Sequence, residues 1–144
     1  MTKIAFGALA VAALAVTCTA MPAFAESVTF KAALSGAEEV PPTASKGTGN
    51  VDVTYDSASK KFSWKGTYSG LTGRVTGAHF HGPAEPGKNA GVEIPLTPTA
   101  SPFEGSLMLS DTQAADLMAG KMYLNLHTAA NANGEIRGQI MKIK

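Results

Sequence analysis

Apolar side chains recur at every second position in most of the segments after residue 26, and this alternation constrains the fold more than any other feature. Val28, Phe30, Ala32 and Leu34 form one such series, and residues 51–55 form another. Because side chains of a strand point alternately to its two faces, a period of two predicts β-strands with one buried face. We therefore expect a chain built mainly of strands.

Further strand signals follow one another at short intervals up to the C-terminus. They lie in residues 62–66, 75–81, 92–96, 103–109, 122–127 and 135–143. Turn-forming residues separate them, such as the Asn133-Gly134 pair, which suits the positive φ angles of a tight hairpin turn. Residues 112–118, with Ser110 or Asp111 as the N-cap, give the one helical signal. The pattern predicts an all-β fold, an antiparallel Greek-key β-sandwich of about seven to eight strands with one short helix.

The first 25 residues have the features of a signal peptide. Lys3 gives the positive start, residues 4–16 form an apolar run, and Ala23-Phe24-Ala25 gives the small-x-small pattern of a cleavage site. The apolar run is short for a membrane-spanning helix, so an N-terminal anchor fits less well. The sequence predicts a signal peptide at residues 1–25, one mature domain at residues 26–144, and a periplasmic or secreted protein.

The single cysteine, Cys18, lies inside this predicted signal peptide. Lipidation of Cys18 is an alternative to cleavage after Ala25, although the preceding Val16-Thr17 fits a lipoprotein signal poorly. After cleavage no thiol remains for a disulfide, a nucleophile or a metal ligand. The 12 basic and 11 acidic residues include no basic run. Nothing in this charge pattern indicates binding to nucleic acid or, after signal cleavage, to a membrane.

The alternation places all three histidines of the chain on polar strand faces. His79 and His81 share one face of a predicted strand, with Cα atoms ~6.5–7 Å apart. His127 ends another strand, opposite its apolar face. Imidazole suits copper, zinc or nickel, and copper(II) binds most strongly in this series. We therefore expect His79, His81 and His127 to hold a metal ion, with copper as the first candidate. The alternative is that the histidines are exposed or bonded to nearby loops, without a metal.

Acidic and basic residues near these strands give weaker signals. Glu135 and Arg137 share a strand face near His127, where they would form a surface ion pair or orient an imidazole. Glu38 and Glu39 are adjacent, so they point to opposite faces of an extended chain and make a poor acid/base pair. No nucleophile elbow and no phosphate-binding glycine loop occurs. A non-enzymatic role is therefore favoured over an enzyme.

Three stretches resemble the signatures of the CHRD domain, a family first described in chordin. They are Leu34-Ser35-Gly36-Ala37-Glu38-Glu39-Val40-Pro41-Pro42, then Gly77-Ala78-His79-Phe80-His81-Gly82-Pro83-Ala84, and a C-terminal part with Tyr123-Leu124-Asn125-Leu126-His127-Thr128-Ala129-Ala130-Asn131 and Gly134-Glu135-Ile136-Arg137-Gly138-Gln139-Ile140. The resemblance covers almost the whole predicted mature chain. It implies a bacterial, stand-alone exported member of this family.

The CHRD domain also resembles the copper/zinc superoxide dismutase sandwich, which uses a His-x-His strand and a later histidine for copper. This resemblance implies copper-ligand positions for the three histidines and places Arg137 near an open coordination position. No further histidine lies between His81 and Val92, so the bridging imidazole and the zinc site have no counterpart. Similar folds can carry different chemistry. We favour an exported copper-binding protein for buffering, delivery or tolerance. A dismutase-like redox enzyme and a metal-free module that binds another exported protein are the alternatives.

Overall fold

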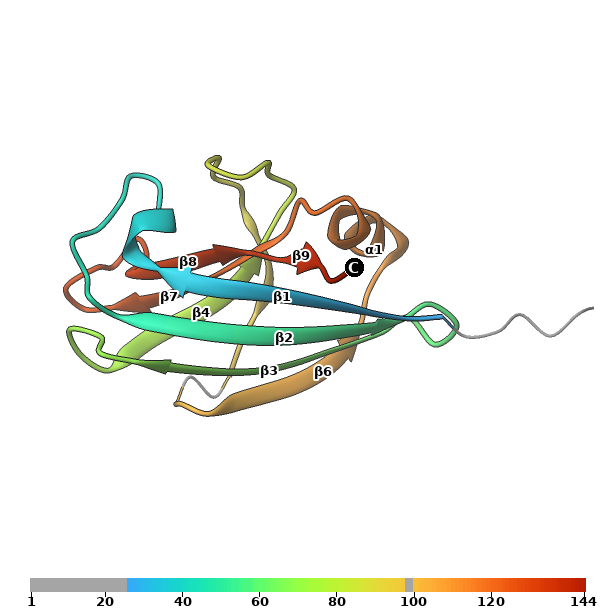
Figure 1. Ribbon diagram of the computed structural model, residues 1–144, viewed down its shortest axis with the longest axis horizontal. Coiled ribbons are helices and arrows are strands. Elements are labelled where there is room, and N and C mark those ends of the chain that lie inside the picture. The colour runs from blue at the N-terminus through green and yellow to red at the C-terminus, as the bar shows by residue number, and fades with distance from the viewer. Residues whose placement is uncertain (1–25, 98–99) are drawn as a thin grey trace, which may run out of the picture.

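The computed structural model describes residues 26–97 and 100–144 (Figure 1). These residues form nine strands, one 3-10 helix and one α-helix. The strands are β1 (Ser27–Ser35), β2 (Thr48–Asp56), β3 (Lys61–Ser69), β4 (Val75–His81), β5 (Val92–Pro95), β6 (Phe103–Met108), β7 (Tyr123–Thr128), β8 (Ile136–Gln139) and β9 (Met141–Lys142), and the helices are η1 (Gly36–Glu38) and α1 (Asp111–Met118). The prediction of an all-β fold with one short α-helix is confirmed. The predicted signal peptide, with Cys18, lies outside the described residues.

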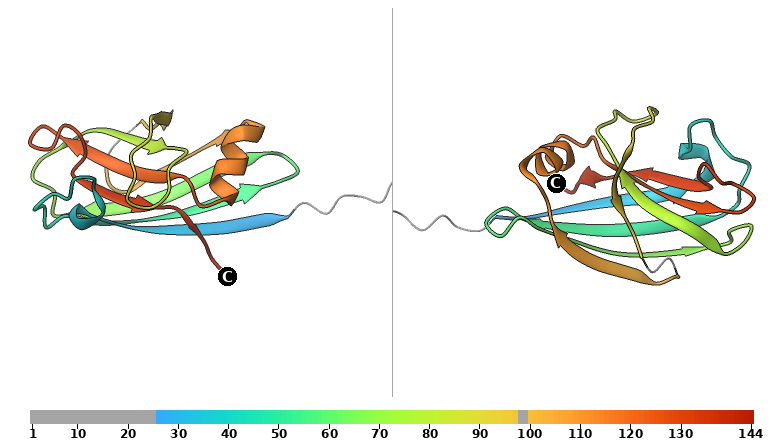
Figure 2. Two further views of the ribbon diagram at one scale, coloured as in Figure 1. Left: turned by 90° about the horizontal axis from the view of Figure 1, so that it is seen from above. Right: turned by 180° about the vertical axis from the view of Figure 1, so that it is seen from behind.

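All strand pairs are antiparallel, and the strands follow the order β5-β4-β7-β8-β1-β2-β3-β6, with β9 beside β1. The chain crosses from one half of this order to the other three times, after β3, after β5 and after β6. One residue pair, Ser35 with Arg137, joins β1 to β8. The sheet therefore curls at this point into two layers, which the turned views show (Figure 2).

The hydrophobic core lies between the two layers and is built from the apolar face of each strand. Every second residue of β1 from Val28 to Leu34 is buried, as the alternation predicts. Phe62 of β3 and Phe80 of β4 meet edge to face across the layers, with ring centroids 5.0 Å apart. Trp64 packs on Phe80 at 5.6 Å. Burial of one such aromatic ring stabilises the fold by about 2–3 kcal/mol, so this cluster holds the layers together.

The helix α1 begins with a capping box at one of the two residues expected to cap it. The Ser110 hydroxyl accepts from the Gln113 backbone N–H, and the Gln113 side chain accepts from the Ser110 backbone N–H. Leu117 anchors the helix because its side chain is buried in the core. Within the described ranges, no helix has the length and apolarity that a membrane span requires.

The C-terminal segment, expected to be one strand, is divided into β8 and β9. Ile140 separates them, and its backbone N–H donates to the Met122 carbonyl at the start of the β7 region. After Ile140 the chain changes partner, because Met141 and Lys142 pair with β1. This exchange of partners closes the corner between the two layers.

The outer face of β4, β7 and β8 is covered by loops, although the sequence predicts a polar, exposed face there. β7 is buried along almost its whole length, including Tyr123 and Asn125 on its outer face. Ala90 in the 82–91 loop contacts Tyr123, and Thr43 in the 39–47 segment donates to the Glu135 carbonyl. Both loops therefore fold over the face on which the histidines lie.

Candidate metal centre

The pairing of β4 with β7 brings the three histidines together. His127 lies opposite Gly77, and His79 lies opposite Asn125, so His79 and His127 are diagonal neighbours on one face. The Nδ1 atom of His79 is 3.0 Å from the Nε2 atom of His127. One ring nitrogen from each of His79, His81 and His127 can be chosen so that all three lie within 4.8 Å of one another. The structure thus joins all three residues that the sequence singles out.

Backbone carbonyls orient two of the three rings. The Nδ1 atom of His127 lies 2.9 Å from the Ala132 carbonyl oxygen, and Nδ1 of His81 lies 3.1 Å from that of Ala90. Because a carbonyl oxygen can only accept, each Nδ1 carries the proton, and Nε2 of a neutral ring keeps its lone pair. Metal-binding histidines are held by hydrogen bonds of this kind. The His127 Nε2 lone pair accepts from Nδ1 of His79.

The side chain of Asn125 covers the second nitrogen of His81. Its Oδ1 atom lies 2.9 Å from His81 Nε2. With Nδ1 of His81 donating to Ala90, Nε2 needs a donor, which Asn125 supplies when its amide is turned so that the nitrogen faces the ring. This turn gives up the hydrogen bond that Asn125 makes to the Glu39 carboxylate. A metal ion would therefore take His81 Nε2 by displacing the Asn125 amide.

His81, Tyr123 and Arg137 form a stack under the 82–91 loop. The rings of His81 and Tyr123 are within 1° of parallel, with centroids 4.8 Å apart. The Arg137 guanidinium lies 3.5 Å from the centre of the Tyr123 ring and donates to the Asn89 side chain and the Lys88 carbonyl. Because β4 and β8 flank β7, His81 and Arg137 approach Tyr123 from opposite sides. Among the described residues, no hydrogen bond joins Arg137 to a histidine.

The expectation of a surface ion pair between Glu135 and Arg137 is wrong, because both side chains are buried. Thr128, Thr72 and Ser45 instead donate to the Glu135 carboxylate, with Oγ-to-Oε distances of 2.6 Å for Thr72 and 2.7 Å for Ser45. Burial alone would raise the pKa of Glu135, but these hydrogen bonds outweigh it and hold the pKa at about 2. The ionised carboxylate therefore ties together four chain segments beside the histidines.

His79 and His81 lie in surroundings that disfavour their charged forms. Burial lowers the pKa of His79, and the neighbouring rings of His127 and His81 lower it further. Burial also lowers the pKa of His81, against the hydrogen bonds to Ala90 and Asn125, which raise it. Both rings are therefore neutral at pH 7, the form in which imidazole binds a metal ion.

Sequence reasoning did not assign roles to several residues around this site. Tyr123 and Asn125 could have been found, because the alternation places them on the same strand face as His127. No alternation in the sequence indicates Asn89 or Glu39, because both lie in loops that fold back onto the site. Glu39 is 5% exposed, whereas its neighbour Glu38, at the end of the 3-10 helix η1, is exposed.

Comparison with known proteins gives one match. The family model of the CHRD domain matches residues 30–140. No match was found among curated proteins or among solved structures. The likeness to the dismutase, and the boundaries of the signal peptide and mature domain, therefore stay predictions. The matched span contains all three histidines and most of the described strands. The chain belongs to the CHRD domain family.

Proposed function

We propose that this CHRD domain is exported and binds one copper ion through His79, His81 and His127. The observation that carries the proposal is the meeting of three imidazoles from two strands, with selected ring nitrogens within 4.8 Å of one another. Nitrogens bound to one ion at about 2.0 Å lie roughly 3–4 Å apart, so small ring rotations suffice to reach that geometry.

The chemistry of the donor set favours copper over harder ions. The three ligands are neutral imidazoles, whereas calcium and magnesium prefer oxygen ligands. Among divalent ions that accept nitrogen ligands, copper(II) binds most tightly. Zinc(II) is the main competitor, and affinity alone ranks it below copper.

The partial exposure of the site suits exchange of the ion. His79 and His127 are half-buried, and His81 is the most buried of the three proposed ligands, with 8% of its surface exposed. An ion here would be held firmly by His81 and reached from solvent beside the other two rings. This arrangement supports buffering, delivery or tolerance in the periplasm. A structural ion would instead be enclosed on all sides.

The decisive experiment is a calorimetric titration of purified, metal-free protein with copper(II), copper(I) and zinc(II). We expect one-to-one binding of copper, with nitrogen couplings in the electron paramagnetic resonance spectrum of the copper(II) form. His79→Ala, His81→Ala and His127→Ala should each weaken binding by about 100-fold or more, since loss of a supporting residue alone costs 10–100-fold. Unchanged binding in all three variants would refute the copper site.

Export is tested separately on the protein produced in its natural host. We expect the mature protein in the periplasm or medium, with Glu26 as its first residue by mass spectrometry. A chain that retains residues 1–25, or one that begins at Cys18 with a lipid, would contradict cleavage after Ala25. This result does not depend on copper binding.

A further inference from the structure

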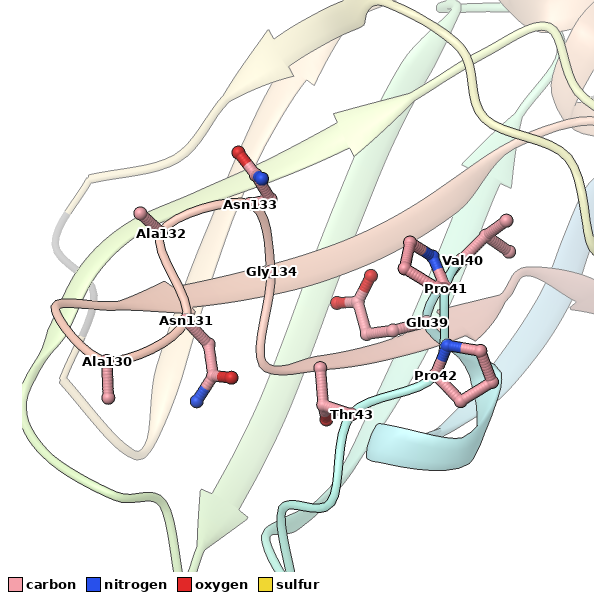
Figure 3. Close-up of a pocket in the computed structure, with 10 residues that line it drawn as sticks. All are labelled: Glu39, Val40, Pro41, Pro42, Thr43, Ala130, Asn131, Ala132, Asn133 and Gly134. Carbon is pink, nitrogen blue, oxygen red and sulfur yellow. The ribbon is translucent and has the colours of Figure 1, made fainter.

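A pocket of about 270 Å³ lies between the segment after η1 and the loop that joins β7 to β8 (Figure 3). It is lined by Glu39, Val40, Pro41, Pro42, Thr43, Ala130, Asn131, Ala132, Asn133 and Gly134. Small-molecule sites usually enclose about 300–1,000 Å³. This pocket therefore suits a single side-chain-sized group better than a large cofactor.

The floor of the pocket contains a buried carboxylate with an unused acceptor. Glu39 is 5% exposed, and its Oε1 atom has no hydrogen-bond partner among the described protein groups. Figure 3 shows the carboxylate pointing towards Gly134, between the two segments that line the pocket. A buried, unpaired carboxylate oxygen is costly, so a donor at this point would be favourable.

Neighbouring charges do not supply that donor. Arg137 attracts the Glu39 carboxylate, but its guanidinium donates to Asn89 and Lys88. Burial outweighs this attraction and raises the pKa of Glu39 to about 7. The lining includes no lysine or arginine and no second acid. A metal cation such as calcium needs six or more oxygen ligands, which one carboxylate does not provide.

We infer that this pocket binds a primary alkylammonium group, with its nitrogen on the Glu39 carboxylate. The aliphatic stem would lie against the prolines and alanines, in a pocket whose lining is otherwise mostly polar. Because Oε1 is itself buried, the nitrogen reaches it after a small displacement of Gly134, which lies directly against Oε1 and has no side chain. The group could come from a free amine or from a lysine side chain of another protein. The inference does not rest on the copper site.

The test is a two-dimensional ¹H–¹⁵N NMR titration of the metal-free protein at pH 8 with n-butylammonium and with Nα-acetyl-lysine amide. Uncharged n-butanol is the matched control ligand. We expect saturable shifts of the Thr43 and Gly134 amide signals with a dissociation constant of roughly 1 mM. Tighter binding of the lysine compound identifies a protein lysine as the source, and tighter binding of n-butylammonium identifies a free amine. Absence of saturable shifts with both amines, or equal shifts with n-butanol, overturns the inference.

Variants locate the bound nitrogen. Glu39→Gln keeps the shape of the side chain and should weaken ammonium binding by about 10- to 100-fold, because the charge-assisted bond is lost. Glu38→Gln, the exposed neighbour, should bind as the unaltered protein does. Equal affinity in the Glu39→Gln variant overturns the inference. As a measurement that needs no variant, the ¹³C signal of the Glu39 carboxyl should titrate at lower pH when the amine is bound, and an unchanged titration would also overturn it.

Discussion

The ring of His81 lies flat on the ring of Tyr123, with centroids 4.8 Å apart and planes within 1° of parallel. Tyr123 also holds the loop above this pair, because its hydroxyl donates to the Ala90 carbonyl and accepts from the Ala90 backbone N–H. The same carbonyl accepts from His81 Nδ1. Tyr123 therefore supports His81 twice, once through its ring and once through the loop.

We predict that Tyr123→Leu weakens copper(II) binding by about 10-fold or more, since residues that orient a metal-binding histidine contribute 10–100-fold to affinity. Tyr123→Phe keeps the ring and removes the hydroxyl, so it should cause a smaller loss. Calorimetric titration measures both. Tyr55→Phe, a tyrosine of the core on β2, is the matched control and should leave affinity unchanged. Equal losses in Tyr123→Phe and Tyr123→Leu would show that stacking on the ring contributes nothing.

The local geometry at position 134 requires a glycine. Its φ angle is +129°, and an added Cβ would overlap Glu39 Oε1 and lie 2.7 Å from the Asn125 amide nitrogen. We predict that Gly134→Ala lowers the free energy of unfolding by about 2–4 kcal/mol, through backbone strain and steric overlap. Urea denaturation measures the change. Gly73→Ala is the control, because a Cβ at Gly73 has no neighbour within 4 Å among the described atoms. Similar losses in both variants would contradict the explanation.

The sequence predicts the division between core and site faces because this division depends on local alternation alone. Phe80 points into the core and is fully buried, while His79 and His81 point to the other face of β4. The same reasoning places His127 on the outer face of β7. A period of two is independent of which strands become neighbours, so these assignments hold without knowledge of the topology.

The meeting of the histidines depends on strand order and register, which the alternation does not determine. β4 and β7 are neighbours because the chain leaves their layer after β5 and returns to it after β6. An irregularity between Val75 and Gly77 sets the register that places Gly77 opposite His127. The alternation also could not predict that the outer face of β7 is buried. This burial results from loops that fold back from distant parts of the chain, such as Asn89, which donates to the Val40 carbonyl.

The hydrogen-bonded carboxylate of Glu135 should stabilise the protein in a pH-dependent way. Its pKa falls from 4.5 to about 2 on folding, so the stabilisation is fully present above pH 4.5 and is lost as the pH falls towards 2. A shift of this size corresponds to about 3 kcal/mol. Glu135→Gln should therefore lower the free energy of unfolding by about 2–3 kcal/mol at pH 7 and by much less near pH 2.

Thermal denaturation of both proteins across this pH range measures the difference. Glu104→Gln, an exposed glutamate on β6, provides the matched control and should change stability little at any pH. A loss in Glu135→Gln that stays constant from pH 7 to pH 2 would point to packing rather than to the charge of the carboxylate.

Glu39 should have the opposite pH dependence, because burial raises its pKa from 4.5 to about 7 despite the attraction of Arg137. Between these two pH values the folded protein retains a proton that the unfolded chain releases, so stability falls as the pH rises from 4.5 to 7. The full effect is about 3 kcal/mol. Glu39→Gln resembles the protonated acid and removes this cost.

We therefore predict that Glu39→Gln raises the free energy of unfolding by about 2–3 kcal/mol at pH 8 and changes it little at pH 4.5. Urea denaturation at both pH values, with Glu38→Gln as the exposed control, measures the effect. If Glu39→Gln instead destabilises the protein at pH 8, attraction between the Glu39 carboxylate and Arg137 exceeds the cost of burial. The carboxylate would then stabilise the fold even without an ammonium ligand.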